Sequence, residues 1–72
     1  MEINMTKVNA FLQDGFETVE ALAVVDVLRR AGMDVETISL MGGLEVKSAQ
    51  DIIVKADKEF AGYDFADTDV FF

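Results

Sequence analysis

Residues 7–40 read KVNAFLQDGFETVEALAVVDVLRRAGMDVETISL, and this stretch decides the fold class. Its first part, residues 7–12, is a short and mostly apolar run that ends in Gln-Asp-Gly, which is typical of a buried strand followed by a tight turn. Residues 17–31 predict a helix, closed by Gly32 in the position that glycine commonly takes just past a helix end. Residues 34–40 alternate polar and apolar side chains and predict a second strand. Strand, helix and strand within about 35 residues indicate a βαβ unit.

The charges of the predicted helix complement its dipole. Glu17 and Glu20 lie in the first turn, and Arg29 and Arg30 lie in the last turn. Asp26 precedes the two arginines at the spacing of helical ion pairs. These positions favour a helix that is stable at both ends.

The apolar side chains of this helix are too many for a single stripe, because residues 21–25 form an unbroken apolar run. We expect Val19, Leu22 and Ala23 to face the sheet, with Val27 at the margin of that face. The remaining apolar residues then point elsewhere. They are either exposed valines on a broad stripe or the contact surface of a partner subunit.

The rest of the chain predicts a turn at residues 41–43 and two short strands, 45–48 and 52–54, that form a small hairpin. Asp57 is a candidate helix cap, opening a section that runs through three aromatic residues to another buried strand, residues 68–72. The crevice that binds ligands in such sheets lies beyond the carboxyl ends of the strands. We therefore expect residues 1–72 to be the amino-terminal part of a single larger domain.

Composition narrows the range of functions and partners that the chain can have. The chain has 72 residues, a formal net charge of −8, and neither cysteine nor histidine, so a disulfide is excluded. Six basic residues against fourteen acidic ones disfavour nucleic acid and anionic membranes as partners. No apolar run approaches the ~20 residues of a membrane span. Residues 1–4 lack the pattern of a signal peptide, so we expect a cytoplasmic protein.

Cofactor and metal motifs are weak. Asp14-Gly15 and Gly42-Gly43 are better explained as turns than as phosphate loops, because no complete nucleotide motif surrounds them. Asp64, Asp67 and Asp69 do not have the spacing of an EF-hand calcium loop. We expect neither a cofactor nor a metal.

Several segments resemble the opening of the ThiJ/PfpI family, which includes bacterial stress proteins and the Parkinsonism-associated deglycase. The segments are FLQDGFETVEAL (residues 11–22), VDVLRRAG (residues 25–32), VKADK (residues 54–58) and DVFF (residues 69–72). They occur in order and together cover nearly the whole chain beyond its first five or so residues.

The resemblance implies a flavodoxin-like three-layer α/β sandwich, represented here by a βαβ unit and a hairpin. It also implies a homodimer, or a complementing carboxy-terminal chain, as the partner. Glu20 matches the family's helix glutamate, whose carboxyl group contacts the sulfur of a catalytic cysteine that is absent from this chain. Gly15 matches the turn glycine beside the substrate pocket. Asp26 and Arg30 match residues near the dimer interface, whereas Gln50 replaces a basic residue or histidine that relatives often carry near that boundary.

The functions implied are those of a cysteine-dependent deglycase, glyoxalase or protease I-like hydrolase. Family members are also labelled chaperones, class I glutamine amidotransferase-like proteins and thiazole monophosphate biosynthesis proteins. By residue type alone, Glu20 fits a solvated first-turn acid, and no serine or threonine has a base that would activate it. We therefore expect the chain alone to be inert. The alternative is a non-catalytic or chaperone-like module that associates through an open sheet edge ending in Val70, Phe71 and Phe72.

Overall fold

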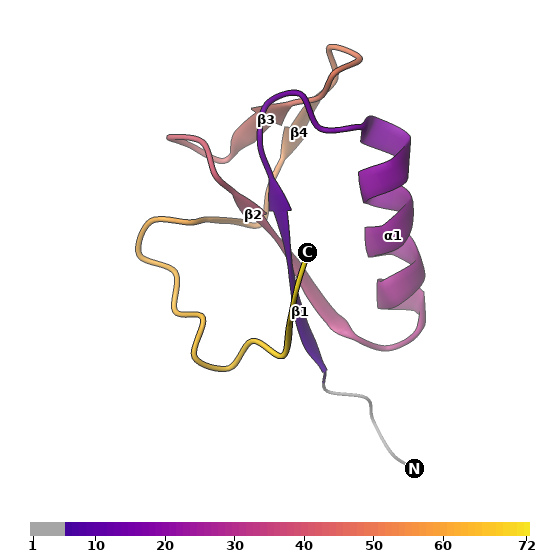
Figure 1. Ribbon diagram of the computed structural model, residues 1–72, viewed down its shortest axis with the longest axis vertical. Helices are drawn as coiled ribbons and strands as arrows, with labels where there is room; N and C mark the ends of the chain where they lie inside the picture. Colours follow the sequence, from indigo (N-terminus) through magenta and orange to yellow (C-terminus); the bar gives the residue numbers. More distant parts are fainter. Residues whose placement is uncertain (1–5) are drawn as a thin grey trace.

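A parallel four-stranded sheet organises the computed structural model, which describes residues 6–72. The strand order is β5-β2-β1-β6. Apart from this sheet, β3 and β4 form an antiparallel pair (Figure 1). The elements are β1 (Lys7–Leu12), α1 (Thr18–Arg30), β2 (Asp34–Ser39), β3 (Glu45–Lys47), β4 (Ile53–Lys55), β5 (Lys58–Glu59) and β6 (Val70–Phe71). The predicted α/β class, the βαβ unit and the hairpin are confirmed. The signal-peptide expectation concerns residues that lie outside the described part of the chain.

β1 is the central strand, and its alternation of side chains builds the core. It pairs in parallel with β2, so that Val8 lies beside Val35. Val8 and Ala10 point toward α1, where they pack with Val35 and with Val25 of the helix. Each of these four side chains is at most 5% exposed, and burying one valine contributes about 1.5–3 kcal/mol.

The carboxyl end of α1 lies where the sequence predicts it. Gly32 adopts a φ of +89°, a left-handed conformation that glycine adopts without steric cost. Its amide donates to the Arg29 carbonyl at 3.0 Å, and the Met33 amide donates to the Leu28 carbonyl at 3.2 Å. These bonds satisfy carbonyl groups that the last turn leaves free. The predicted stop at Gly32 is confirmed.

The face that α1 turns to the sheet differs from the prediction. Val25 is the buried residue of the helix, whereas Val19 is 79% exposed and Val27 is 61% exposed. Leu28 packs against the same core as Val25. The expected places of Val19, Ala23 and Val27 were therefore wrong, because the broad apolar run offered two stripes and the stripe through Val25, Leu28 and the half-buried Leu22 covers the sheet.

The expected helix after Asp57 is also absent; this part of the described chain forms β5 and a series of turns. Asp57 does not cap a helix. Its Oδ2 accepts hydrogen bonds from the Thr37 amide at 2.8 Å and from Arg29 Nη2 at 2.8 Å. Gly62, with a φ of +79°, turns the chain where a helix would have to continue. Tertiary contacts therefore outweighed the local capping signal.

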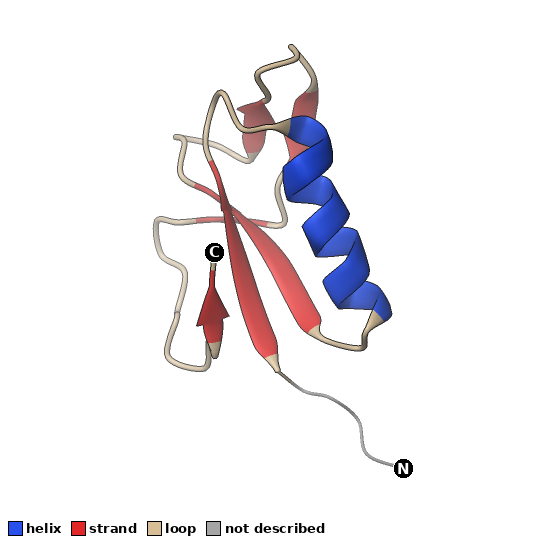
Figure 2. Cartoon of the chain, turned by 45° about the vertical axis from the view of Figure 1, so that its right-hand side comes forward, coloured by secondary structure: helices blue, strands red, loops and turns tan. Residues whose placement is uncertain are grey.

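Residues 60–69, which we call the strap, cover the sheet face opposite α1 (Figure 2). Phe65 of the strap lies with its ring centroid 5.8 Å from that of Phe11 in β1, and Phe71 stacks on Phe11 at the same separation. Below these rings, the fully buried Asn9 donates to Tyr63 Oη at 3.2 Å. The sheet thus lies between a helix and an aromatic strap.

None of the helices in residues 6–72 is long and apolar enough to cross a membrane.

Candidate functional site

The loop between β1 and α1 is fixed by backbone contacts with the β3–β4 hairpin. The Gly15 amide donates to the Lys47 carbonyl at 2.8 Å, and the Ala49 amide donates to the Phe16 carbonyl at 2.8 Å. The Asp14 carboxylate accepts a further hydrogen bond from the Lys47 amide at 3.1 Å. Because the loop follows the carboxyl end of a parallel strand, it lies at the edge of the sheet where α/β proteins bind ligands.

Gly15 is required here by its backbone conformation. Its φ is +94°, and a Cβ atom at this position would meet no atom within 4 Å. The space in front of the glycine is therefore open, so the conformation and not crowding selects the residue. An approaching molecule can reach the backbone of the turn directly.

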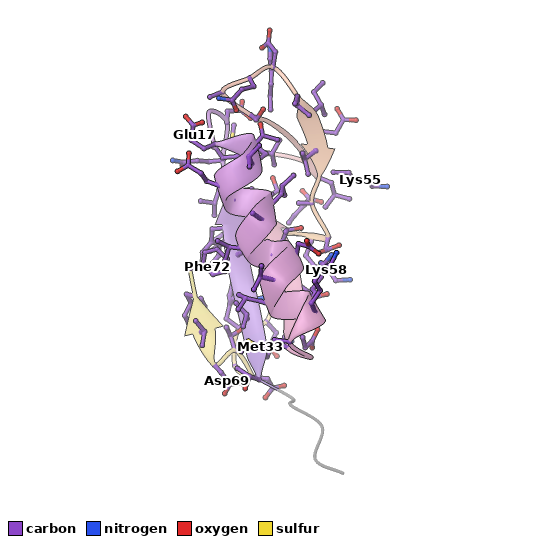
Figure 3. The ribbon with its side chains drawn as sticks, turned by 90° about the vertical axis from the view of Figure 1, so that its right-hand side faces the viewer. Glu17, Met33, Lys55, Lys58, Asp69 and Phe72 are labelled. Carbon is purple, nitrogen blue, oxygen red and sulfur yellow. The ribbon has the colours of Figure 1, made fainter. Side chains whose placement is uncertain are left out.

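Two acids lie at the amino end of α1 in unequal environments, Glu17 at the cap position and Glu20 in the first turn. Glu17, at the amino end of α1 in Figure 3, accepts a hydrogen bond from Gln50 Nε2 at 2.9 Å. Glu20 is exposed, and its carboxylate has no hydrogen-bond or ion-pair partner in the described residues 6–72. The positive end of the helix dipole favours negative charge at both positions. Of the two, Glu20 has the carboxylate that is available to another group.

The sequence pointed to Gln50 only as a substitution near the dimer boundary and missed its contacts with the start of α1. Its Oε1 accepts from the Thr18 amide at 3.2 Å and from Thr18 Oγ1 at 2.8 Å, so that it caps α1 from the hairpin. The sequence does contain a signal for this contact. Glu17 occupies the cap position in place of the usual Ser, Thr, Asp or Asn, and a helix without a cap of its own needs one from elsewhere.

Neither buried serine is free to act as a nucleophile. Ser39 Oγ donates to the Gly43 carbonyl at 2.6 Å and accepts from the Met41 amide at 3.1 Å. Ser48 Oγ accepts hydrogen bonds from two amides of its own turn. Within residues 6–72, no three acidic side chains gather closely enough to hold a metal ion. The site therefore presents a carboxylate and an open turn.

Asp26 and Arg30 lie on the exposed surface of α1, away from Glu20. Arg30 Nε lies 2.9 Å from Asp26 Oδ1, which confirms the predicted helical pairing for this arginine. Arg29 instead pairs with Asp57. Next to the Asp26–Arg30 pair, a shallow apolar depression of about 240 Å³ is lined by four helix residues. Its residues are Ala23, Val24, Val27 and Leu28.

Asp57 joins α1 to the sheet through charge and hydrogen bonds. Partial burial alone would raise the pKa of its carboxyl group, but hydrogen bonds from the Thr37 amide and hydroxyl, together with the charge of Arg29, outweigh it. The pKa of Asp57 is therefore lower than its ordinary value. Arg29 also donates to the Val35 carbonyl at 2.8 Å, so one guanidinium holds both the strand and the segment after β4.

Comparison with known proteins gives a consistent picture. The family model of the DJ-1/PfpI family matches residues 6–72. A cysteine-to-alanine mutant of a DJ-1 superfamily protein from Salmonella typhimurium is 42% identical, with a TM-score of 0.74. Oxidized DJ-1 from Toxoplasma gondii is 35% identical, with a TM-score of 0.73. A DJ-1 superfamily protein from Agrobacterium tumefaciens, 22% identical with a TM-score of 0.78, shares the fold. No curated protein matched the chain.

The similarity covers most of this chain and a minor part of each solved structure. It covers 76% of this chain and 30% of the Salmonella protein, and 75% of this chain and 29% of the Toxoplasma protein. For the Agrobacterium protein the shares are 93% and 36%. The chain thus spans about a third of the length of these structures.

Proposed function

This chain belongs to the DJ-1/PfpI family, and from that premise we propose that it is the amino-terminal part of a cysteine-dependent enzyme. The enzyme acts on small aldehydes or glycated groups, as a deglycase or glyoxalase, or it acts as a hydrolase. Glu20 supports the cysteine, and Gly15 borders the substrate. The observation that carries the proposal is the exposed Glu20 carboxylate, which has no partner in residues 6–72, in the helix that follows the open turn at Gly15.

The chemistry assigned to Glu20 follows from the reactivity of thiols. A thiolate is the nucleophilic form of cysteine, and it adds to the carbonyl carbon of an aldehyde. A neighbouring carboxyl group can share or accept the thiol proton and so set the fraction of thiolate. This chain contains no cysteine, so the nucleophile must come from another part of the enzyme and the chain alone is inert.

The test begins with the intact mass of the protein from its native source, followed by an assay of that species with methylglyoxal. A species heavier than the 7.9 kDa of this chain, carrying cysteine and active, supports the proposal. Glu20→Ala should then lower activity by about 10²-fold or more, the range of acid–base contributions, whereas Glu45→Ala should leave it unchanged. An inactive 7.9 kDa species would contradict the proposal that this chain belongs to an enzyme. Full activity of the Glu20→Ala variant would contradict the proposed role of Glu20 in supporting the cysteine.

A second function, association without catalysis, is favoured by the exposed edge strand β6. Val70, Phe71 and Phe72 are 45%, 52% and 44% exposed. Phe72 uses its amide and carbonyl to bind β1, so the alternation of a strand directs the peptide groups of Phe71 outward. An unpaired edge of this kind accepts a further strand, either from a second copy or from a complementing carboxy-terminal chain.

Two surfaces are candidates for binding a partner: the edge of β6 and the exposed face of α1. A homodimer through α1 would cover the depression at Val24 and Val27, with Asp26 and Arg30 at its border. Light scattering on variants separates the two surfaces. Phe71→Lys should dissociate an assembly that forms through β6, and Val27→Lys should dissociate one that forms through α1. A monomer in the unmodified protein would contradict both interfaces.

A further inference from the structure

We infer that Gln50 is a positioning residue for Glu20. From the β3–β4 hairpin, it caps α1 and binds Glu17, which leaves the Glu20 carboxylate free. The inference rests on the function proposed above for Glu20, but its test includes measurements that require no enzymatic activity.

The start of α1 depends on Gln50. The first N–H groups of a helix have no partner within the helix, and a short polar side chain at the cap position normally accepts one of them. Glu17 occupies that position, and its side chain makes no capping hydrogen bond. Gln50 Oε1 supplies the acceptor, 3.2 Å from the Thr18 amide and 2.8 Å from Thr18 Oγ1. The helix therefore begins at Thr18 under the control of a residue from a different element.

The same side chain also binds Glu17. Gln50 Nε2 donates to Glu17 Oε2 at 2.9 Å, so the amide accepts with its oxygen and donates with its nitrogen. A carboxylate at position 50 would only accept, and an ammonium group would only donate. The Gln50 amide makes both contacts, which neither of these charged groups can do, and asparagine is one methylene shorter.

Gln50 is presented by a turn with its own hydrogen bonds. The buried Ser48 Oγ accepts from the Gln50 amide at 3.3 Å and from the Ile52 amide at 3.1 Å. Asp51 adopts a φ of +65°, and the neighbouring Ala49 donates to the Phe16 carbonyl. The turn is therefore closed by its own hydrogen bonds on both sides of Gln50 and is held against the β1–α1 loop through Ala49.

The consequence concerns the two first-turn acids. Glu17 is the cap residue of α1 and Glu20 lies three positions later, so both negative charges lie at the amino end of the helix and repel each other. The hydrogen bond to Gln50 directs the Glu17 carboxylate toward the hairpin. Glu20 keeps no partner within residues 6–72, so its carboxylate can serve a group outside this part of the fold.

Four variants separate the two contacts. Gln50→Glu retains the cap acceptor and loses the donor to Glu17, whereas Gln50→Lys retains the donor and loses the acceptor. The exchange Glu17→Gln with Gln50→Glu keeps the cap acceptor and restores the contact between positions 17 and 50 with its donor and acceptor reversed, at unchanged net charge. Gln13→Glu is the control, because it adds the same charge as Gln50→Glu in the adjoining β1–α1 loop and the Gln13 side chain makes no hydrogen bond in the described residues.

The first measurement is amide hydrogen exchange in the 72-residue protein, followed by NMR. Gln50→Lys should speed exchange of the Thr18 amide by about fivefold to tenfold, the loss expected for a helix cap. Gln50→Glu should leave that rate unchanged but release the Glu17 side chain into several rotamers. The double exchange should restore a single side-chain rotamer at position 17, which a merely structural effect of mutation would not do.

The second measurement is the pH profile of iodoacetamide alkylation in the cysteine-bearing species. Both single Gln50 variants should shift the profile, and the double exchange should return it. The inference is overturned if both single Gln50 variants have the same Thr18 amide exchange rate and the same pH profile of alkylation as the Gln13→Glu control. A profile that is unmoved by Glu20→Ala would instead overturn the proposed function, whatever the NMR measurements give.

Discussion

Gly15 fixes the loop before α1 through its left-handed backbone, and its replacement tests that requirement. A side chain in this conformation costs about 1–2 kcal/mol, and the surrounding space adds no clash. Gly15→Ala should therefore lower the free energy of unfolding by about that amount. The measurement is urea denaturation followed by circular dichroism. Gly43→Ala is the control, because its Cβ is equally free of contacts and its backbone is not left-handed; equal losses in the two variants would contradict the argument.

Asp57 makes stability depend on pH. Because its folded pKa lies below the ordinary value of 3.8, folding favours the ionised carboxylate. Its contribution is complete above pH 3.8 and is lost as the pH falls through the lower folded value. At this partly exposed position, Asp57→Asn should cost about 0–1 kcal/mol at neutral pH and nothing well below pH 3.8. Urea denaturation midpoints at the two pH values check this prediction. Asp67→Asn is the control for removal of an exposed charge. If Asp57→Asn still lowers the free energy of unfolding at low pH, the effect comes from packing and not from charge.

At the scale of elements, the two valines of α1 should respond differently to truncation. Val25 is 5% exposed against the sheet and Val27 is 61% exposed on the outer face. Val25→Ala should lower the free energy of unfolding by about 2 kcal/mol, since it removes buried apolar surface and leaves a small cavity. Val27→Ala should change it by less than about 0.5 kcal/mol. Thermal denaturation measures both, and a large loss for Val27→Ala would show that its face is covered.

The single elements also show which parts of the fold and of the site could be predicted from the sequence. The bounds of β1, α1 and β2 follow from local patterns, above all the apolar run before Gly15 and the glycine at position 32. The strap could not be predicted in this way, because Asp57 has the form of a helix cap until Thr37, twenty residues earlier, is placed beside it. For the site, the positions of Gly15 and Glu20 could be predicted, whereas the contacts of Gln50 depend on how the hairpin docks.

At the scale of the whole molecule, Tyr63 ties the strap to the sheet. Its hydroxyl donates to Glu36 Oε1 at 2.5 Å and accepts from the fully buried Asn9. Tyr63→Phe leaves the Asn9 amide without that acceptor, which should cost about 1–3 kcal/mol. Urea denaturation followed by far-ultraviolet circular dichroism measures the loss. Glu36→Gln keeps an acceptor for the hydroxyl and should be nearly neutral; a larger loss in this control would place the main interaction in the charge of Glu36.

The central position of β1 also determines when both of its edges can be paired during synthesis. β1 pairs with β2 on one side and with β6 on the other, and β6 is made after the other strands of the described residues. Residues 40–69, 30 in number, must be added between β2 and β6. At about 5–20 residues per second, the ribosome needs about 2–6 s for them. During that interval one edge of the newly made β1 is unpaired, and a chaperone that shields extended apolar segments would find its binding site there.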